Sequence, residues 1–158
     1  MIDKNTGYIK LTKFSESSYE EFMQAMEALQ KQGIQSLVFD LRGNGGGFMN
    51  EAVDMADEFL EGDKLIVYTE GVNSKKREYR CKRPGLFEKG KLVILVDELS
   101  ASAREVLAGA LQDWCRATII GRRTFGKGLV QEQYSLSDGS AMRLTVARYY
   151  TPLGRSIQ

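Results

Sequence analysis

Ser102 and Lys127 are the residues of this chain whose types and spacing could support nucleophilic catalysis. A serine hydroxyl needs a general base, and the sequence contains no histidine, which excludes every Ser-His-Asp triad and Cys-His dyad. A lysine amine is the remaining common base, provided that burial lowers its pKa toward neutrality. Lys127 lies between Gly126 and Gly128, which would let the backbone bring it close to another loop. The pair therefore predicts acyl transfer by a Ser/Lys dyad.

Taken alone, Ser102 is better explained as a helix N-cap than as a nucleophile. It begins the sequence Ser-Ala-Arg-Glu, which fits a capping box. It also follows an apolar run at residues 92–96 that reads as a buried strand, and it precedes a helix with an apolar face. Such a junction can hold a side chain toward a ligand, so only the combination of Ser102 with other loops favours catalysis.

A glycine-rich loop at residues 40–47, Asp-Leu-Arg-Gly-Asn-Gly-Gly-Gly, follows a short apolar strand at residues 37–39. So many glycines indicate a backbone in conformations that other residues avoid, or one that a ligand approaches closely. The loop has neither GxGxxG nor the Gly-Lys-Ser/Thr ending of a phosphate loop. In an acyl-transfer site, the N–H of Gly46 or Gly47 could join the N–H of Ala103 in an oxyanion hole.

Strand patterns that alternate with helix patterns predict an α/β domain that would bring these loops together. Continuous apolar runs indicate mostly parallel strands, whose following loops converge at one edge of a sheet. The final pair of strands, joined by a short turn, is expected to be antiparallel. Helices are expected from the capping boxes at 17–21 to Gly33, from residue 50 or 51, and after Ser102. Strands are expected at 8–11, 37–39, 65–68, 92–96, 117–120, 129–134 and 142–150.

The composition excludes several classes of partner. At 158 residues, with 42% hydrophobic and 27% charged residues, the chain suits one globular domain. The net charge of +1 provides no basic surface for nucleic acid or an anionic membrane. No apolar run reaches the roughly 18 residues of a membrane span, and the polar start lacks a signal-peptide core. We therefore expect neither a nucleic-acid partner nor a direct membrane span.

The two cysteines are expected to have no catalytic role. Cys115 follows Trp114 at a helix end and is expected to be a small buried residue, whereas Cys81, in a basic stretch, is expected to be partly exposed. Neither has a CxxC partner, and a chain without histidine offers few zinc ligands, so no metal or redox site is expected. A single disulfide between the two remains open.

Four segments together resemble the carboxyl-terminal processing (tail-specific) protease family. Residues 100–113 read Ser-Ala-Ser-Ala-Arg-Glu-Val-Leu-Ala-Gly-Ala-Leu-Gln-Asp, and residues 121–131 read Gly-Arg-Arg-Thr-Phe-Gly-Lys-Gly-Leu-Val-Gln. The loop at 40–47 is similar to the Asp-Leu-Arg-x-Asn-Pro-Gly-Gly loop of the family, and residues 149–158 are similar to its late strand and turn. The resemblance covers nearly the whole chain in order.

The resemblance implies a serine endopeptidase that cleaves protein substrates near their C-termini and needs no metal or cofactor. Its nucleophile falls on Ser102 rather than Ser100, because Lys127, the implied base, then follows at the spacing of the family. The glutamine that orients the lysine falls on Gln131. The oxyanion donors fall on the backbone N–H groups of three residues: Ala103, Gly46 and Gly47.

The family also implies a fold, partners and a compartment. Its fold is the crotonase/ClpP-like α/β superhelix, and a PDZ domain that binds substrate tails normally precedes the core. The family works in the bacterial cell envelope or periplasm, or in plastid lumens. We therefore expect residues 1–158 to be a single protease catalytic core, excised from a longer chain without its PDZ domain, that acts on protein or peptide tails. A homo-oligomer is compatible with this expectation.

Four positions depart from the pattern of the family. Gly45 replaces a usual proline, Leu99 a usual glycine, Arg104 a usual serine and Arg122 a usual glutamate. None of them is a proposed catalytic side chain. Two alternatives therefore stay open: a non-catalytic peptide-binding or scaffold module with the same fold, and a crotonase-like acyl-CoA enzyme that uses the glycine loop as its oxyanion hole.

Overall fold

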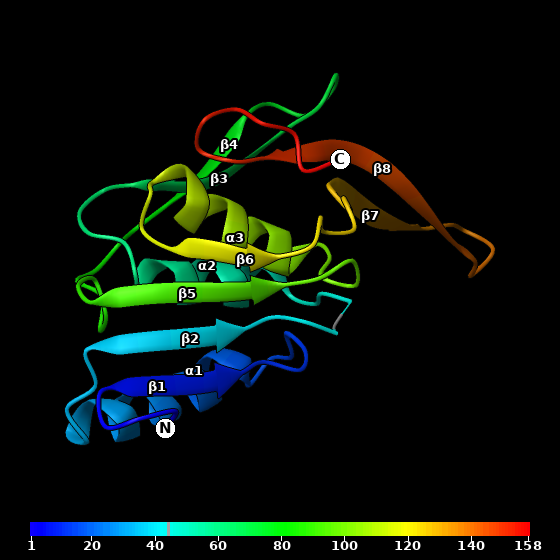
Figure 1. Ribbon diagram of the computed structural model, residues 1–158. Helices are drawn as coiled ribbons and strands as arrows, with labels where there is room; N and C mark the ends of the chain where they lie inside the picture. The colour runs from blue at the N-terminus through cyan, green and yellow to red at the C-terminus, as the bar shows by residue number, and fades with distance from the viewer. Residues whose placement is uncertain (44) are drawn as a thin grey trace.

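Two four-stranded sheets and three helices form the α/β fold of the computed structural model, which describes residues 1–43 and 45–158 (Figure 1). The first sheet has the order β1 (Thr6–Lys10), β2 (Ser36–Asp40), β5 (Lys91–Val96), β6 (Thr118–Gly121). The second has the order β4 (Arg77–Arg80), β3 (Leu65–Glu70), β8 (Ala141–Tyr150), β7 (Leu129–Ser135). The helices are α1 (Ser18–Lys31), α2 (Met49–Asp57) and α3 (Ala103–Asp113).

The first sheet is parallel throughout, as its continuous apolar runs predicted. Parallel pairing places the carboxyl ends of all its strands at one edge, where the arrowheads lie together in Figure 1. The loops that leave β2, β5 and β6 carry the glycine run, Ser102 and Lys127, respectively. Because β2, β5 and β6 are parallel neighbours, these three loops begin side by side at the same edge of the sheet.

The second sheet is antiparallel, which corrects the expectation of mostly parallel pairing for the whole fold. β7 and β8 form the predicted antiparallel pair, from Leu129 opposite Arg148 to Ser135 opposite Ala141. The charged segment at 75–83 contributes β4, which pairs with β3. Short turns join the strands within each of these two hairpins, and a short turn can only connect antiparallel neighbours.

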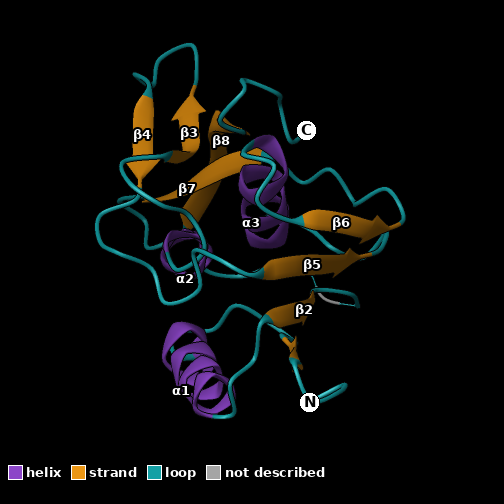
Figure 2. Cartoon of the chain, turned by 60° about the vertical axis from the view of Figure 1, so that its left-hand side comes forward, coloured by secondary structure: helices purple, strands orange, loops and turns teal. Residues whose placement is uncertain are grey.

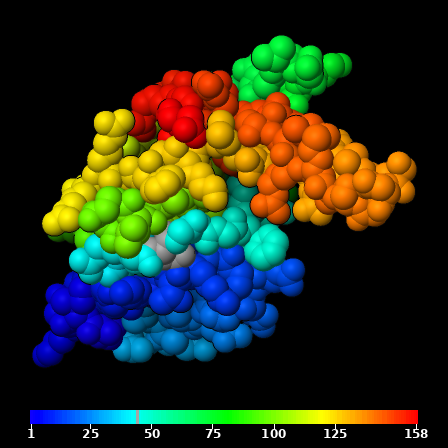
Figure 3. Space-filling view, turned by 90° about the vertical axis from the view of Figure 1, so that its right-hand side faces the viewer, coloured from blue at the N-terminus to red at the C-terminus, as the bar shows by residue number. Residues whose placement is uncertain are grey.

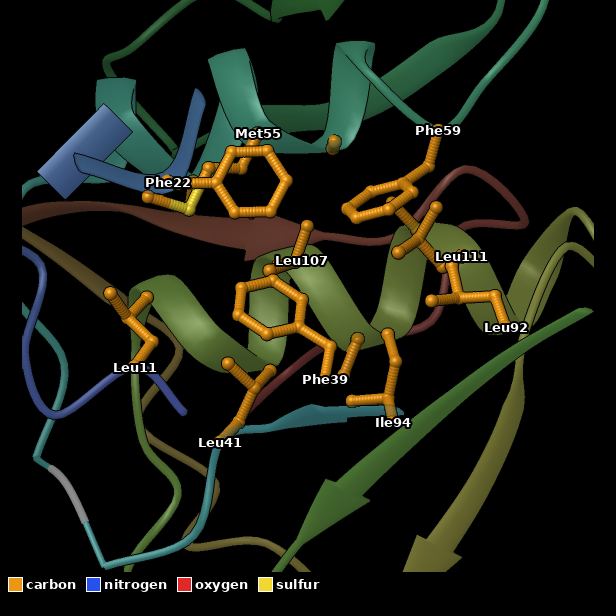
Figure 4. Close-up of a cluster of buried hydrophobic side chains, with 14 of the residues drawn as sticks. Leu11, Phe22, Phe39, Leu41, Met55, Phe59, Leu92, Ile94, Leu107 and Leu111 are labelled. Atoms are coloured by element: carbon orange, nitrogen blue, oxygen red, sulfur yellow. The ribbon is translucent and has the colours of Figure 1, made fainter. Parts of the chain in front are cut away.

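The helices lie on one face of the parallel sheet, and α2 and α3 fill the space between the two sheets (Figure 2). Their packing depends on three phenylalanines: Phe22 of α1, Phe39 of β2 and Phe59 just after α2. The ring centroids lie 5.4 Å apart for Phe22 and Phe39, 5.6 Å for Phe22 and Phe59, and 6.1 Å for Phe39 and Phe59. In Figure 4, Leu107 and Leu111 of α3 lie beside these rings in the same core cluster. Each such buried side chain stabilises the fold by about 1.5–3 kcal/mol, which holds α3, and the loop before it, rigidly.

The helix starts differ in detail from the expectation. The Ser17 hydroxyl bonds the Glu21 carboxylate at 2.7 Å and makes no cap hydrogen bond to the helix backbone, so the predicted capping boxes at 17–21 do not form. Ser18 is instead buried, and its hydroxyl accepts the N–H of Ser15 at 2.8 Å. Helix α2 begins at Met49, one residue before the expected start.

Both cysteines differ from the expectation. Cys81 is buried beside Asp57, because β4 carries it under the end of α2, whereas Cys115 is exposed in the turn after α3. Both are free thiols, so no disulfide joins them. In the described part of the chain, no three potential metal-ligating side chains gather at one place. No helix within the same residues is long and apolar enough to cross a bilayer.

The two thiols are expected to differ sharply in reactivity. Burial, together with the nearby Asp57 carboxylate, raises the pKa of the Cys81 thiol to about 12, so very little reactive thiolate forms. At about pH 8, iodoacetamide is expected to modify Cys115 and leave Cys81 intact, and to modify both in denaturant. Peptide mass spectrometry reads the two sites separately. Equal modification of both thiols in the folded protein would contradict the burial of Cys81.

Candidate active site

Ser102 occupies a strained junction between β5 and α3. Its backbone adopts φ 58° and ψ −117°, a region that residues other than glycine rarely occupy and that costs about 1–3 kcal/mol. The strain sits at the carboxyl edge of the parallel sheet, and the half-buried side chain faces the glycine loop, since a Cβ at Gly46 would lie 2.9 Å from the Ser102 Cβ. A plain N-cap does not require this conformation, so the junction favours a functional serine over a simple cap.

Ser100 has a structural role. It is fully buried, and its hydroxyl donates to the Leu41 carbonyl at 2.9 Å and accepts the Asp97 N–H at 3.1 Å. These bonds tie the loop after β5 to the loop after β2. The hydroxyl of Ser100 is therefore occupied in holding the two loops together.

The glycine loop passes directly against the Ser102 junction. A Cβ at Gly46 would lie 2.8 Å from the Ala101 carbonyl oxygen, and one at Gly47 would lie 2.0 Å from the Phe14 carbonyl oxygen. Both glycines also have positive φ, at 99° and 146°. Only glycine fits these two positions, which explains the glycine run by close approach of backbones. Asn44, in the middle of the loop, lies outside the described residues.

The predicted oxyanion donors converge on this junction. Ala103 is the first residue of α3, so its N–H precedes the intrahelical hydrogen bonds and is directed out of the helix N-terminus. Gly46 lies beside Ser102 and Gly47 is the next residue of the loop. The three predicted donors thus belong to two backbone segments that are in contact, the glycine loop and the start of α3. Their role in stabilising an oxyanion stays a prediction.

Glu105 connects the serine loop to the lysine loop. Its carboxylate is buried and accepts three backbone N–H groups, from Ser102 at 2.8 Å, Gly126 at 2.6 Å and Lys127 at 2.8 Å. The sequence suggested only a capping box for Glu105, and its bond to Ser102 is the capping contact. The bonds to Gly126 and Lys127 cross between elements that no local pattern relates. Glu105 is therefore a positioning residue that the sequence-based prediction missed.

Lys127 reaches the site through its backbone. Besides the bond to Glu105, the N–H of Phe125 donates to the Ser100 carbonyl at 3.0 Å, so the lysine loop lies along the serine loop. The Lys127 side chain is exposed, as is Gln131 on β7. No hydrogen bond joins either side chain to Ser102 in the part of the chain that the structure describes. The structure thus brings the loops of the predicted dyad together, and contact between the side chains stays a prediction.

Two more carboxylates, those of Asp40 and Asp97, hold the start of the glycine loop. Asp40, fully buried at the end of β2, accepts the Tyr8 hydroxyl at 2.6 Å and the Arg42 Nε at 2.9 Å, which holds the pKa of its carboxyl well below the usual range. Asp97, after β5, accepts the Gly43 N–H at 2.9 Å. The glycine loop is therefore anchored at its start by charge-assisted bonds to two neighbouring strands.

A surface groove of about 870 Å³ lies away from these residues. It separates the turn at 70–74 from the β7–β8 hairpin and contains neither Ser102 nor Lys127. The hairpin projects from the body as the orange arm in Figure 3. This groove therefore does not coincide with the candidate site, which lies where the three loops meet.

Comparisons with known proteins agree on a protease family. The model of peptidase family S41 matches residues 5–158. The carboxyl-terminal-processing protease of Synechocystis sp. is 41% identical over 149 residues, which are 94% of this chain and 34% of that protein. The carboxy-terminal processing protease CtpA of Bacillus subtilis is 38% identical over 157 residues, 99% of this chain and 34% of that protein.

A solved structure with the same arrangement is that of a photosystem II D1 C-terminal processing protease. It superposes with a TM-score of 0.88 at 41% identity, over 95% of this chain and 38% of that one. The chain spans about a third of the length of the curated relatives described above.

Proposed function

The chain belongs to peptidase family S41, and from that premise we propose that it is the catalytic core of a C-terminal processing serine endopeptidase with a Ser102/Lys127 dyad. The observation that carries the proposal is the Glu105 carboxylate. It binds the backbone N–H groups of both dyad residues, and thereby holds a serine at a strained junction next to a glycine-flanked lysine.

In the proposed reaction, the Ser102 Oγ attacks the scissile carbonyl carbon while the neutral Lys127 Nζ takes the hydroxyl proton. The carbonyl oxygen becomes an oxyanion that the N–H groups of Ala103 and of Gly46 or Gly47 stabilise. The C–N bond then breaks, and the departing amine receives the proton from Lys127. Water, deprotonated by Lys127, hydrolyses the acyl-enzyme and restores Ser102. Gln131 would hold the lysine in position throughout.

Substrate binding would complete the environment of the lysine. A lysine acts as a base only where water is excluded, and the Lys127 side chain is exposed in this chain. A bound peptide that lies across the serine and lysine loops would cover it. We therefore propose that desolvation of Lys127 accompanies binding of the substrate.

The family supplies the wider assignment. Relatives include bacterial and chloroplastic processing proteases, which supports protein tails as substrates and a compartment such as the bacterial envelope or periplasm. The parallel sheet with helices on one face supports a place within the crotonase/ClpP-like superhelix class. Residues 1–158 would then be one catalytic core that works without metal or cofactor.

A fluorophosphonate probe tests the assignment, because it reacts with activated serines. Stoichiometric labelling at Ser102, located by mass spectrometry, together with cleavage of a peptide tail, is the expected result. Tail binding without labelling would establish the non-catalytic module instead. Binding of coenzyme A, with labelling blocked by it, would establish the acyl-CoA enzyme.

A further inference from the structure

Arg104 is buried in an unusual way. It is the largest fully buried side chain in the described part of the chain, and two of its guanidinium nitrogens, Nε and Nη1, have no hydrogen-bond partner. The third, Nη2, donates to the Thr12 carbonyl at 3.2 Å. Burial lowers the pKa of the guanidinium to about 10. A half-paired buried cation is unfavourable for stability, so its presence calls for a different explanation.

The segment that Arg104 touches is the one that supports the glycine loop. The guanidinium carbon lies 5.8 Å from the centre of the Phe14 ring. The Phe14 N–H donates to the Gly46 carbonyl at 3.3 Å, and the Phe14 carbonyl accepts the Phe48 N–H at 3.0 Å. Through Phe14, Arg104 is therefore connected to both sides of the Gly46/Gly47 pair.

We propose that Arg104 is a positioning residue that sets the distance between the two halves of the oxyanion hole. One half is the N–H of Ala103, the residue before Arg104 in the first turn of α3. The other half is the N–H of Gly46 or Gly47, which Phe14 holds in place. Arg104 joins the first turn of α3 to the segment at 12–14 by one hydrogen bond to the Thr12 carbonyl and one cation–ring contact with Phe14. The inference rests on the proposed function.

The expected consequence of losing this connection is kinetic. Oxyanion donors work only at about 2.7–3.1 Å from the position of the developing charge. A shift of about 1 Å in such a site can cost on the order of a hundredfold in rate. Loosening Phe14 would move the glycine donors relative to Ala103.

The test compares Arg104→Met with Arg104→Lys in the fluorophosphonate assay and in peptide cleavage. Methionine keeps an unbranched apolar stem but removes the guanidinium with its charge and donors, and it is expected to lower kcat and the labelling rate by about tenfold or more with little change in KM. Lysine can still reach the Thr12 carbonyl and is expected to restore most of the rate. The thermal midpoint of Arg104→Met is expected to stay level or rise, since an unpaired buried charge is removed.

Arg116→Met is the matched control. Arg116 is a partly buried arginine just beyond the opposite end of α3, and it donates to the carbonyls of Phe59, Gly90 and Phe87 at 2.9, 3.0 and 2.7 Å. Its loss is expected to lower the thermal midpoint and leave the labelling rate of the folded protein unchanged. Arg104→Met should therefore lower the labelling rate without lowering the thermal midpoint, whereas Arg116→Met should lower the thermal midpoint without lowering the labelling rate.

Phe14→Leu provides a second route should Arg104→Met fold poorly, because it weakens the same connection from the other side and is expected to slow labelling in the same way. Labelling of Arg104→Met and Phe14→Leu at the rate of the unmodified protein would overturn the inference and leave the proposed function standing. Absence of labelling at Ser102 in the unmodified protein would overturn the proposed function, and the inference with it.

Discussion

Ser102→Ala and Lys127→Ala are each expected to lower peptide cleavage by at least about a thousandfold while the fold stays intact. The first removes the attacking oxygen and the second removes the base. Alanine at position 102 adds no backbone strain beyond that of serine, and the Lys127 side chain is exposed, so its truncation should change stability by less than about 0.5 kcal/mol. Steady-state cleavage of a peptide tail, with circular dichroism of each variant, measures both effects.

Two further variants sharpen this prediction. Ser137→Ala, in the exposed turn between β7 and β8, is the matched serine control and should keep full activity. Lys127→Arg retains the positive charge but supplies no neutral base, and it should be as inactive as Lys127→Ala. Near-normal turnover in Lys127→Ala would remove Lys127 from the mechanism.

Glu105→Gln is expected to lower activity by about a hundredfold or more. The carboxylate accepts three backbone N–H groups, whereas an amide offers one oxygen and would turn its NH2 group toward at least one of those donors. The amide would therefore weaken the link between the loops of Ser102 and Lys127, since the Gly126 N–H loses its acceptor when the amide oxygen takes the place of Oε2. An unmet buried donor also costs about 1–3 kcal/mol of stability, so the thermal midpoint should fall as well as the labelling rate.

Glu58→Gln separates the two effects. Glu58 is equally buried after α2, and its carboxylate accepts the Leu86 N–H at 2.8 Å and the Tyr19 hydroxyl at 2.6 Å, away from the three loops. Its replacement should lower the thermal midpoint and leave the labelling rate of the folded protein unchanged. If Glu105→Gln behaves like Glu58→Gln, Glu105 is a stabilising residue alone.

Much of the site was accessible from residue types and local patterns. The absence of histidine restricted the base to lysine, the glycine flanks singled out Lys127, and the apolar runs before each loop indicated parallel strands. Parallel strands place their following loops at one edge whatever the rest of the chain does. That general property is why the convergence of the glycine, serine and lysine loops could be expected before any coordinates.

Burial and long-range partners could not be anticipated in this way. Cys81 was expected to be partly exposed and is buried, whereas Cys115 was expected to be buried and is exposed. Burial at a strand end or a helix end depends on what packs over it. The exposure of the Lys127 side chain likewise depends on tertiary packing and could not be predicted from the sequence.

The sequence by itself determined which residues could act and that their loops would meet, since chemistry resides in side-chain types and strand direction in local periodicity. Only the tertiary structure decided how those loops are held. Glu105 bonds residues 21 and 22 positions away, and Asp40 bonds Tyr8 at a separation of 32 positions. The sequence does not show which distant N–H or O–H groups will donate to a carboxylate, because those groups come close to it only when the chain is folded.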